Sequence, residues 1–202
     1  MTENFERLHR FGLKIFFDPI REIETGIFIP VFHRWIQEKA VETLLIDVAD
    51  YRHVKDGPSI LLAGYEANYA IDVSEGRPSL CYYRKQPCSG SLSTKLTLAT
   101  RALLKAASLL ETDVEVGATC KFRYDEICFF PNDRLVAPTT AYTSQNLVTE
   151  LEGFRHLLFR EKNISIDHSK RFDTAVNIKE RIFFSIKGES GATAKELINN
   201  LS

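Results

Sequence analysis

The segment Ser91–Glu111 constrains the fold most, because its apolar residues repeat at helical spacing over about six turns. The predicted stripe consists of Leu92, Leu96, Ala99, Leu103, Ala106 and Leu110. The cationic residues Lys95, Arg101 and Lys105 are predicted to lie outside it. An amphipathic helix of this kind must bury its stripe against another element, so the chain needs a second layer of structure.

Three further helices are predicted. One begins near Ser144, which suits the N-cap position and precedes apolar residues at intervals of four, three and four. Those apolar residues are Leu147, Leu151, Phe154 and Leu158. Another opens at Ile29-Pro30, because proline suits the first helical turn. Thr193 is predicted to cap a last, short helix.

Short apolar or alternating runs between the helices predict strands. They cover 13–17, 44–48, 60–63 with a continuation at 67–73, 80–84, 119–124 and 127–130, and weaker candidates cover 164–167, 176–178 and 181–187. The run 44–48 lacks alternation, which predicts burial on both faces. Asp125 and Glu126 are predicted to form the turn of a hairpin. Arg181–Lys187 alternates and is predicted to be half-exposed.

The order of elements is β-α-β-β-β-α-β-β-α-β-β-α. Hairpins dominate this order and βαβ alternation is incomplete, which disfavours a doubly wound fold. We therefore predict a single α+β domain over residues 1–202. Its sheet is mixed or largely antiparallel, and amphipathic helices pack on it.

Composition narrows the classes of protein. The 202 residues are 44% hydrophobic and 26% charged, which is typical of a globular domain. The formal net charge of −1 argues against a general nucleic-acid binder, which normally carries a strong basic excess. No apolar run approaches the roughly 20 residues that span a bilayer, and no secretory signal is visible. The sequence thus predicts a cytoplasmic protein without a nucleic-acid or membrane partner.

The four cysteines stand at positions 81, 88, 120 and 128. Their spacings match no zinc knuckle and no CxxC redox pair. In a cytoplasmic protein such residues are expected to be reduced thiols in the interior. No metal site is predicted from them.

Sequence motifs with a defined chemistry are missing. The phosphate-binding loop, the glycine motif for dinucleotides, HExxH, GxSxG and the EF-hand loop do not occur. Their absence removes the commonest routes to nucleotide, zinc-protease and hydrolase chemistry. It leaves open whether the protein is an enzyme, and the cofactor stays unknown.

Polar and aromatic residues are concentrated between positions 33 and 69. They are His33, Trp35, Asp47, Asp50, Tyr51, His53, Tyr65, Glu66, Asn68 and Tyr69. If the helix after Pro30 packs on the sheet, His33 and His53 could approach each other, and Glu66 could join them. Histidine and carboxylate groups together can share acid–base work or bind a divalent metal. In the simpler interpretation all three are ordinary surface or loop residues.

Two further groups are candidates for ligand binding. Tyr65 and Tyr69, with the tyrosines at 82 and 83, could line a pocket for a flat ligand, although strands place such rings in cores as often. Arg134, in the loop Asn132-Asp133-Arg134, could bind an anion or simply fix its loop.

Three functions are compatible with these features. The favoured one is a non-catalytic domain that binds a small ligand or a partner protein, because no catalytic group of residues has a known spacing. The second is an enzyme using His33, His53 and Glu66, and the third is a subunit whose role is assembly into a homo-oligomer. The predicted ligand-binding set is His33, His53, Tyr65, Glu66, Tyr69 and Arg134, and the segment His33–Tyr69 is expected to line the functional surface.

Overall fold

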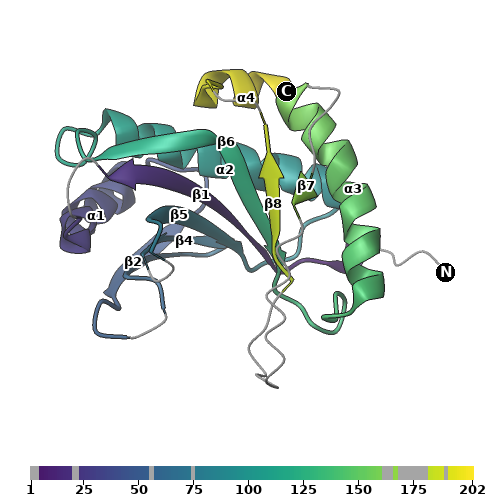
Figure 1. Ribbon diagram of the computed structural model, residues 1–202. Coiled ribbons are helices and arrows are strands. Elements are labelled where there is room, and N and C mark those ends of the chain that lie inside the picture. Colours follow the sequence, from purple (N-terminus) through teal and green to yellow (C-terminus); the bar gives the residue numbers. More distant parts are fainter. Residues whose placement is uncertain are drawn as a thin grey trace.

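The chain forms an antiparallel sheet with helices packed on it, which confirms the α+β prediction (Figure 1). The computed structural model describes residues 5–19, 23–54, 57–73, 76–160, 166–167, 182–188 and 191–202. The strands are β1 (Phe11–Pro19), β2 (Leu45–Asp50), β3 (Ile60–Gly64), β4 (Ala67–Asp72), β5 (Ser79–Arg84), β6 (Cys120–Pro131), β7 (Ile166–Asp167) and β8 (Phe184–Lys187). The helices are α1 (Phe28–Glu38), α2 (Leu92–Thr112), α3 (Ala141–Phe159) and α4 (Ala194–Asn200), with 3-10 turns η1 (Phe5–Arg7) and η2 (Thr25–Ile27).

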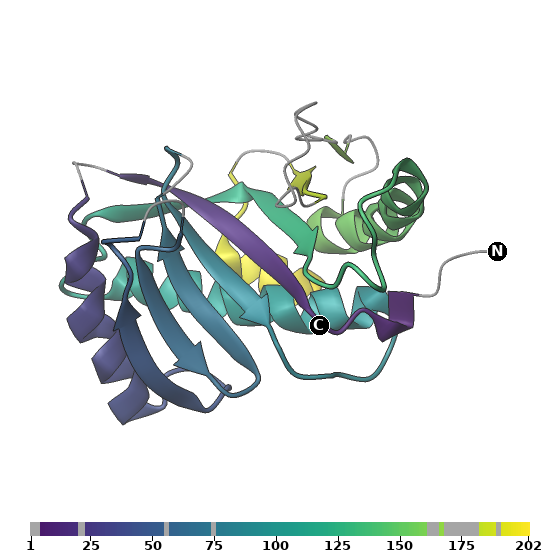
Figure 2. The same ribbon diagram turned by 90° about the horizontal axis from the view of Figure 1, so that it is seen from below.

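The eight strands of the described residues follow the order β2-β3-β4-β5-β1-β6-β8-β7. All neighbouring pairs are antiparallel. The strand β1 therefore lies inside the sheet, between β5 and β6, while β2 forms one edge. Helix α1 lies beside β2 at that end of the sheet, and α2 crosses behind the strands in Figure 2.

Alternation along β1 assigns its side chains to two faces. Phe11, Leu13 and Ile15 point toward the helices and are at most 1% exposed. They join the buried residues of all four helices in one core. Lys14 points to the second face of the sheet, which is the face opposite the helices.

Helix α2 forms as predicted. The side chain of Ser91 caps it by accepting a hydrogen bond from Thr94 N at 3.2 Å, and all six residues of the predicted stripe are buried. The prediction for Lys95 was wrong, because this residue is only 1% exposed. The segment around η1 lies over this side of α2, so the ammonium donates to the carbonyls of Glu6 and Leu8.

The amino ends of two helices, α3 and α1, lie earlier in the chain than predicted. Helix α3 begins one turn earlier than predicted, because Thr140 is the N-cap and accepts from Thr143 N at 3.1 Å. Ser144 lies inside this helix and is buried. The cap at Thr193 is confirmed, with Glu196 completing a capping box. Helix α1 begins at Phe28, two residues before the predicted proline.

The predicted hairpin around Asp125 and Glu126 was wrong, because 120–131 is a single strand. The strand β6 pairs with β1 at 120–122 and again at 127–131, and a register shift leaves residues 123–126 outside that ladder. Glu126 stays in the ladder opposite Lys187 of β8. The β8 side thus holds these polar residues in extended backbone, with Gly188 N donating to Asp125 O at 2.8 Å, although their local preference is for a turn.

Strand β2 also differs from its prediction. It lies at the edge of the sheet and most of its side chains are exposed or half-buried, so it is not buried on both faces. The predicted continuation of 60–63 into 67–73 is instead a tight hairpin between β3 and β4. A Cβ at Gly64 would lie 2.3 Å from the carbonyl oxygen of Ala67, so the turn requires glycine.

The C-terminal strand predictions are confirmed only in part. Strands β7 and β8 fall within the predicted 164–167 and 181–187. In β8, Ser185 is buried, so the half-exposed pattern predicted for this segment does not hold there. The predicted strand 176–178 lies outside the described residues.

We predict that Leu103→Ala and Leu151→Ala each lower the free energy of unfolding by roughly 2–5 kcal/mol. Both side chains are 0% exposed in the core, and each substitution leaves a cavity. Urea denaturation measures the change. Leu98→Ala is the matched control on α2, because Leu98 is 58% exposed and its loss should cost less than about half a kcal/mol. Equal effects at Leu98 and Leu103 would contradict the assignment of the core.

Candidate functional site

The structure does not bring His53 and Glu66 together. His53 lies in the loop after β2, and Glu66 lies in the turn between β3 and β4. Strand β3 separates them, since its first residue pairs with the end of β2 and its last residue with the start of β2. This places the two side chains at opposite ends of a strand about 13 Å long. His33 is exposed on α1.

Glu66 has a local structural role. Its carboxylate accepts hydrogen bonds from the hydroxyl of Thr43 and from Leu44 N, and its own amide donates to the same hydroxyl at 3.3 Å. The hydrogen bond from Thr43 is the main reason that the pKa of Glu66 lies below its ordinary value. These contacts clamp the turn after β3 to the chain that enters β2, which fixes Leu44 beside Tyr65.

The loop that carries His53 is held by neighbouring ion pairs. The guanidinium of Arg52 donates to Asp50 at 2.7 Å and lies 3.6 Å from the carboxylate of Glu24. Hydrogen bonds from Arg52 lower the pKa of Asp50 to about 2. The imidazole of His53 lies beside the ring of Tyr51, with 6.5 Å between the ring centroids. The loop is thereby tied to the segment before α1.

The two tyrosines of the predicted ligand-binding set have different environments. Tyr69 is a core residue at 1% exposure, and its ring meets those of Trp35 and Tyr82 edge-on. Burial raises the pKa of Tyr69 above its ordinary value. Tyr65 is 55% exposed at the turn after β3.

Arg134 lies apart from the other predicted site residues. It is exposed in the loop after β6, and β6 is three strands away from β4, or about 14 Å across the sheet. The loop is closed by Asp133, whose carboxylate accepts from Leu135 N at 3.1 Å and Val136 N at 3.3 Å. The loop-fixing role therefore belongs to Asp133.

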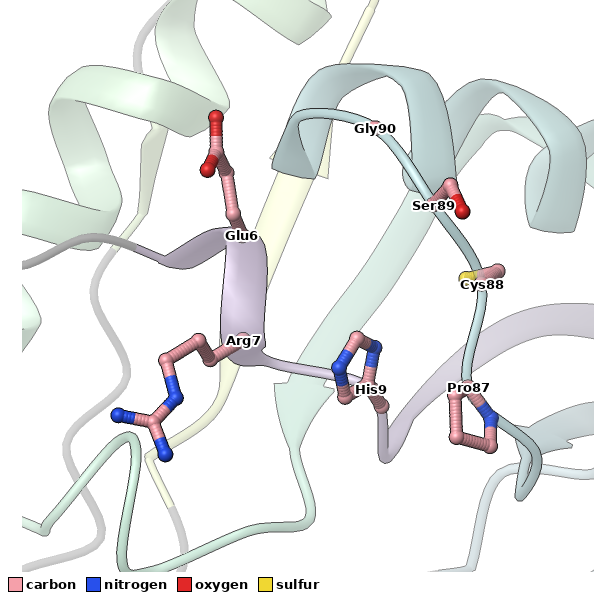
Figure 3. A pocket seen from close by; sticks show the side chains of 7 residues that line it. All are labelled: Glu6, Arg7, His9, Pro87, Cys88, Ser89 and Gly90. Carbon is pink, nitrogen blue, oxygen red and sulfur yellow. The ribbon is translucent and has the colours of Figure 1, made fainter.

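A pocket of about 490 Å³ lies between η1 and the loop before α2 (Figure 3). It is lined by Glu6, Arg7, His9, Pro87, Cys88, Ser89 and Gly90. The side chains of Glu6 and Arg7 point away from the loop in Figure 3. Nδ1 of His9 lies 3.5 Å from the ammonium of Lys95, which is already bonded to carbonyl groups. The polar groups of this pocket do not converge on one point.

Sequence reasoning missed a buried polar row on the second face of the sheet. Lys14 pairs with Cys81 on one side and with Cys128 on the other, so the three side chains lie next to one another. The ammonium of Lys14 lies 3.2 Å from a carboxylate oxygen of Asp72, and both residues are less than 10% exposed. A single lysine within the apolar run 11–17 was the signal that could have indicated this row.

The polar network continues beside this row. Arg77 donates to Glu126 at 2.9 Å, and the hydroxyl of Ser185 donates to the same carboxylate at 2.7 Å. Burial tends to raise the pKa of Glu126, but these hydrogen bonds outweigh it, and the net shift is downward. The guanidinium of Arg77 also lies 3.6 Å from the ring centre of Phe16. The charged groups named here are each paired, as expected for buried charges.

The buried thiols of this face are poor nucleophiles. Burial raises the pKa of Cys81 to about 11 and also raises the pKa of Cys128, although nearby Lys14 acts in the opposite direction. All four cysteines of the chain are free, and only Cys88 is not fully buried. The second face therefore offers a paired polar network, and its thiols at Cys81 and Cys128 are neither accessible nor reactive.

Exposed apolar side chains gather at the two ends of β2. At its amino end, Leu44 is 64% exposed, Ile46 58% and Tyr65 55%. Tyr65 N donates to Leu44 O at 2.8 Å, which places these two residues side by side. At its carboxyl end, Tyr51 is 39% and Val54 45% exposed. We call these five residues and the strand between them the β2 edge surface.

The backbone of β2 is partly shielded. The carboxylate of Asp47 accepts a hydrogen bond from Val48 N at 2.8 Å, and the register with β3 shifts at Ile46. Bulges and charged residues of this kind are typical of edge strands that avoid indiscriminate pairing. The strand has β3 on one side, and no strand of the described chain lies on the other.

No family model, curated protein or solved structure matches this chain. Among the described residues, no three His, Cys, Asp or Glu side chains are grouped so that they could bind a metal ion. None of the described helices has both the length and the apolar character needed to cross a membrane.

We predict that iodoacetamide labels one cysteine, Cys88, in the native protein at pH 8. Burial raises the pKa of Cys81 and Cys120 to about 11, which leaves about one thiol in a thousand ionised at that pH. Mass spectrometry counts the labels. The same reaction in denaturant without reductant should give four labels. A second cysteine labelled as fast as Cys88 in the native protein would contradict the burial described here.

We also predict that Asp72→Ala lowers the free energy of unfolding by roughly 3–5 kcal/mol, because it leaves the buried ammonium of Lys14 without this carboxylate. The double variant Lys14→Met/Asp72→Leu should recover most of the loss. Denaturant titration measures both changes. Asp125→Ala is the control, because its ion pair with Arg123 is exposed and contributes less than about 1 kcal/mol. A loss at Asp72 no larger than at Asp125 would refute the role of the pair.

Proposed function

We propose that this chain is a non-catalytic partner-binding domain and that the β2 edge surface is where the partner binds. One observation carries the proposal. Ten large apolar side chains are exposed in the described chain. Four of them belong to β2 and the residues next to it, and a fifth, Tyr65, lies beside its amino end in the turn after β3. Scattered exposed apolar residues are normal, but a concentration at one place is typical of an interaction site.

The backbone of β2 adds to this argument. An edge strand presents amide and carbonyl groups that an added strand can pair with, and many domains bind extended peptides in this way. In such complexes the main chain gives affinity and side-chain contacts give specificity. The exposed apolar residues at both ends of β2 are suited to make those side-chain contacts.

Hydrogen bonds and ion pairs hold both ends of the β2 edge surface in place. The clamp between Glu66 and Thr43 fixes its amino end, and the ion pairs of Arg52 with Asp50 and Glu24 fix its carboxyl end. Because these contacts exist before binding, little conformational entropy is lost when a partner binds. The surface lies within the segment 33–69, which was expected from composition to line the functional surface.

Catalysis and small-ligand binding have less support. The proposed enzyme used His33, His53 and Glu66, but β3 keeps His53 and Glu66 apart. A small-ligand site needs polar groups that converge in a pocket, and those around His9 do not. We therefore favour partner binding over both.

Selection of short unstructured peptides from a phage-displayed library on the wild-type protein tests the proposal. Enriched peptides should bind at least about tenfold more weakly to Ile46→Lys and Tyr65→Lys, because a charge replaces an apolar contact. They should also slow hydrogen exchange in β2. Val114→Lys is the matched control, because Val114 is 92% exposed and lies outside the β2 edge surface.

Peptides that bind equally well to wild type, Ile46→Lys and Tyr65→Lys would contradict the proposal. So would exchange protection confined to another surface. The melting temperatures of the three variants should match that of the wild type, because each changed side chain is mostly exposed.

A further inference from the structure

We infer that the β2 edge surface pairs with the same surface of a second copy, so that two β2 strands run antiparallel about a two-fold axis. This inference rests on the proposed function and names the partner. It would join two sheets into one continuous sheet. The axis would pass through the middle of β2, at Val48 or Ala49.

The distribution of apolar residues fits a two-fold axis. One cluster (Leu44, Ile46, Tyr65) lies at the amino end of β2, and the other (Tyr51, Val54) lies at the carboxyl end. In an antiparallel pair the amino end of each strand lies beside the carboxyl end of the other. The surface is therefore complementary to itself, which is the requirement for a two-fold interface.

The backbone of β2 has groups available for this pairing. Tyr51 N donates to Ser59 O at 2.9 Å. Because antiparallel pairs alternate between bonded and non-bonded, Val48 and Asp50 direct their backbone groups away from β3. The outward amide of Val48 donates to the side chain of Asp47. Pairing exchanges that hydrogen bond for one between strands.

The charges of Asp47 and Asp50 restrict where the two-fold axis can cross β2. With the axis at Val48, Asp47 would face Ala49 of the other copy, and Asp50 would face Ile46. With the axis at Ala49, the same aspartates would face Tyr51 and Val48. Neither arrangement opposes two acids. An axis at Asp47 or Asp50 would place each against its own copy, and like charges directly opposite are destabilising.

Sedimentation equilibrium across a range of protein concentrations tests the inference. The wild type should show a reversible monomer–dimer equilibrium. Val48→Pro should abolish the dimer, because it removes an outward amide, and an edge strand tolerates proline where the amide faces outward. Asp47→Ala should tighten the dimer about three- to tenfold, because it frees the amide of Val48. Val114→Lys should leave the equilibrium unchanged.

A wild type that stays monomeric up to millimolar concentration overturns the inference, as does a dimer that Val48→Pro or Asp47→Ala leaves unchanged. If Val48→Pro fails to fold by circular dichroism, Ile46→Lys provides the same test, because only an exposed side chain changes. The peptide selection separates the two proposals. Peptides that bind β2 of a monomeric protein would remove the second copy as partner and leave the binding surface in place.

Discussion

The central strand β1 determines what both faces of the sheet can be. It pairs with β5 on one side and β6 on the other, so its backbone is satisfied and its side chains must alternate. Residues such as Leu13 and Ile15 build the core beneath the helices. The residue between them, Lys14, is forced onto the opposite face. That face therefore needs Asp72 and the neighbouring polar network, because a buried ammonium requires a partner.

How much of the fold could be predicted depends on how local its causes are. The stripe of α2 and the helix cap at Thr193 follow from neighbouring residues, and both were predicted. The burial of Lys95 was not predicted, because its partners are carbonyls about ninety residues earlier in the chain. Likewise, Asp125 and Glu126 favour a turn by themselves, and pairing with residues about sixty positions later, Lys187 and Gly188, keeps them extended.

In the candidate site, too, the features with local causes could be predicted and those that depend on distant pairing could not. Composition identified the segment 33–69 as polar and aromatic, but it could not show which ends of the strands meet. The hairpin register sends His53 and Glu66 to opposite ends of β3. The exposed residues Leu44 and Ile46 appeared to belong to a buried strand, because a continuous apolar run has the same pattern at an edge as in the middle of a sheet.

The position of β1 also affects how the chain emerges during synthesis. Phe11 of β1 pairs with Pro131 of β6, 120 residues later. At about 5–20 residues per second, the ribosome needs roughly 6–24 s to make that partner. For this time an apolar strand that will lie inside the sheet has an open edge, and a pairing between such distant segments also closes slowly. Protection of the nascent strand β1 by a chaperone should therefore matter more for this protein than for one whose sheet is built from consecutive hairpins.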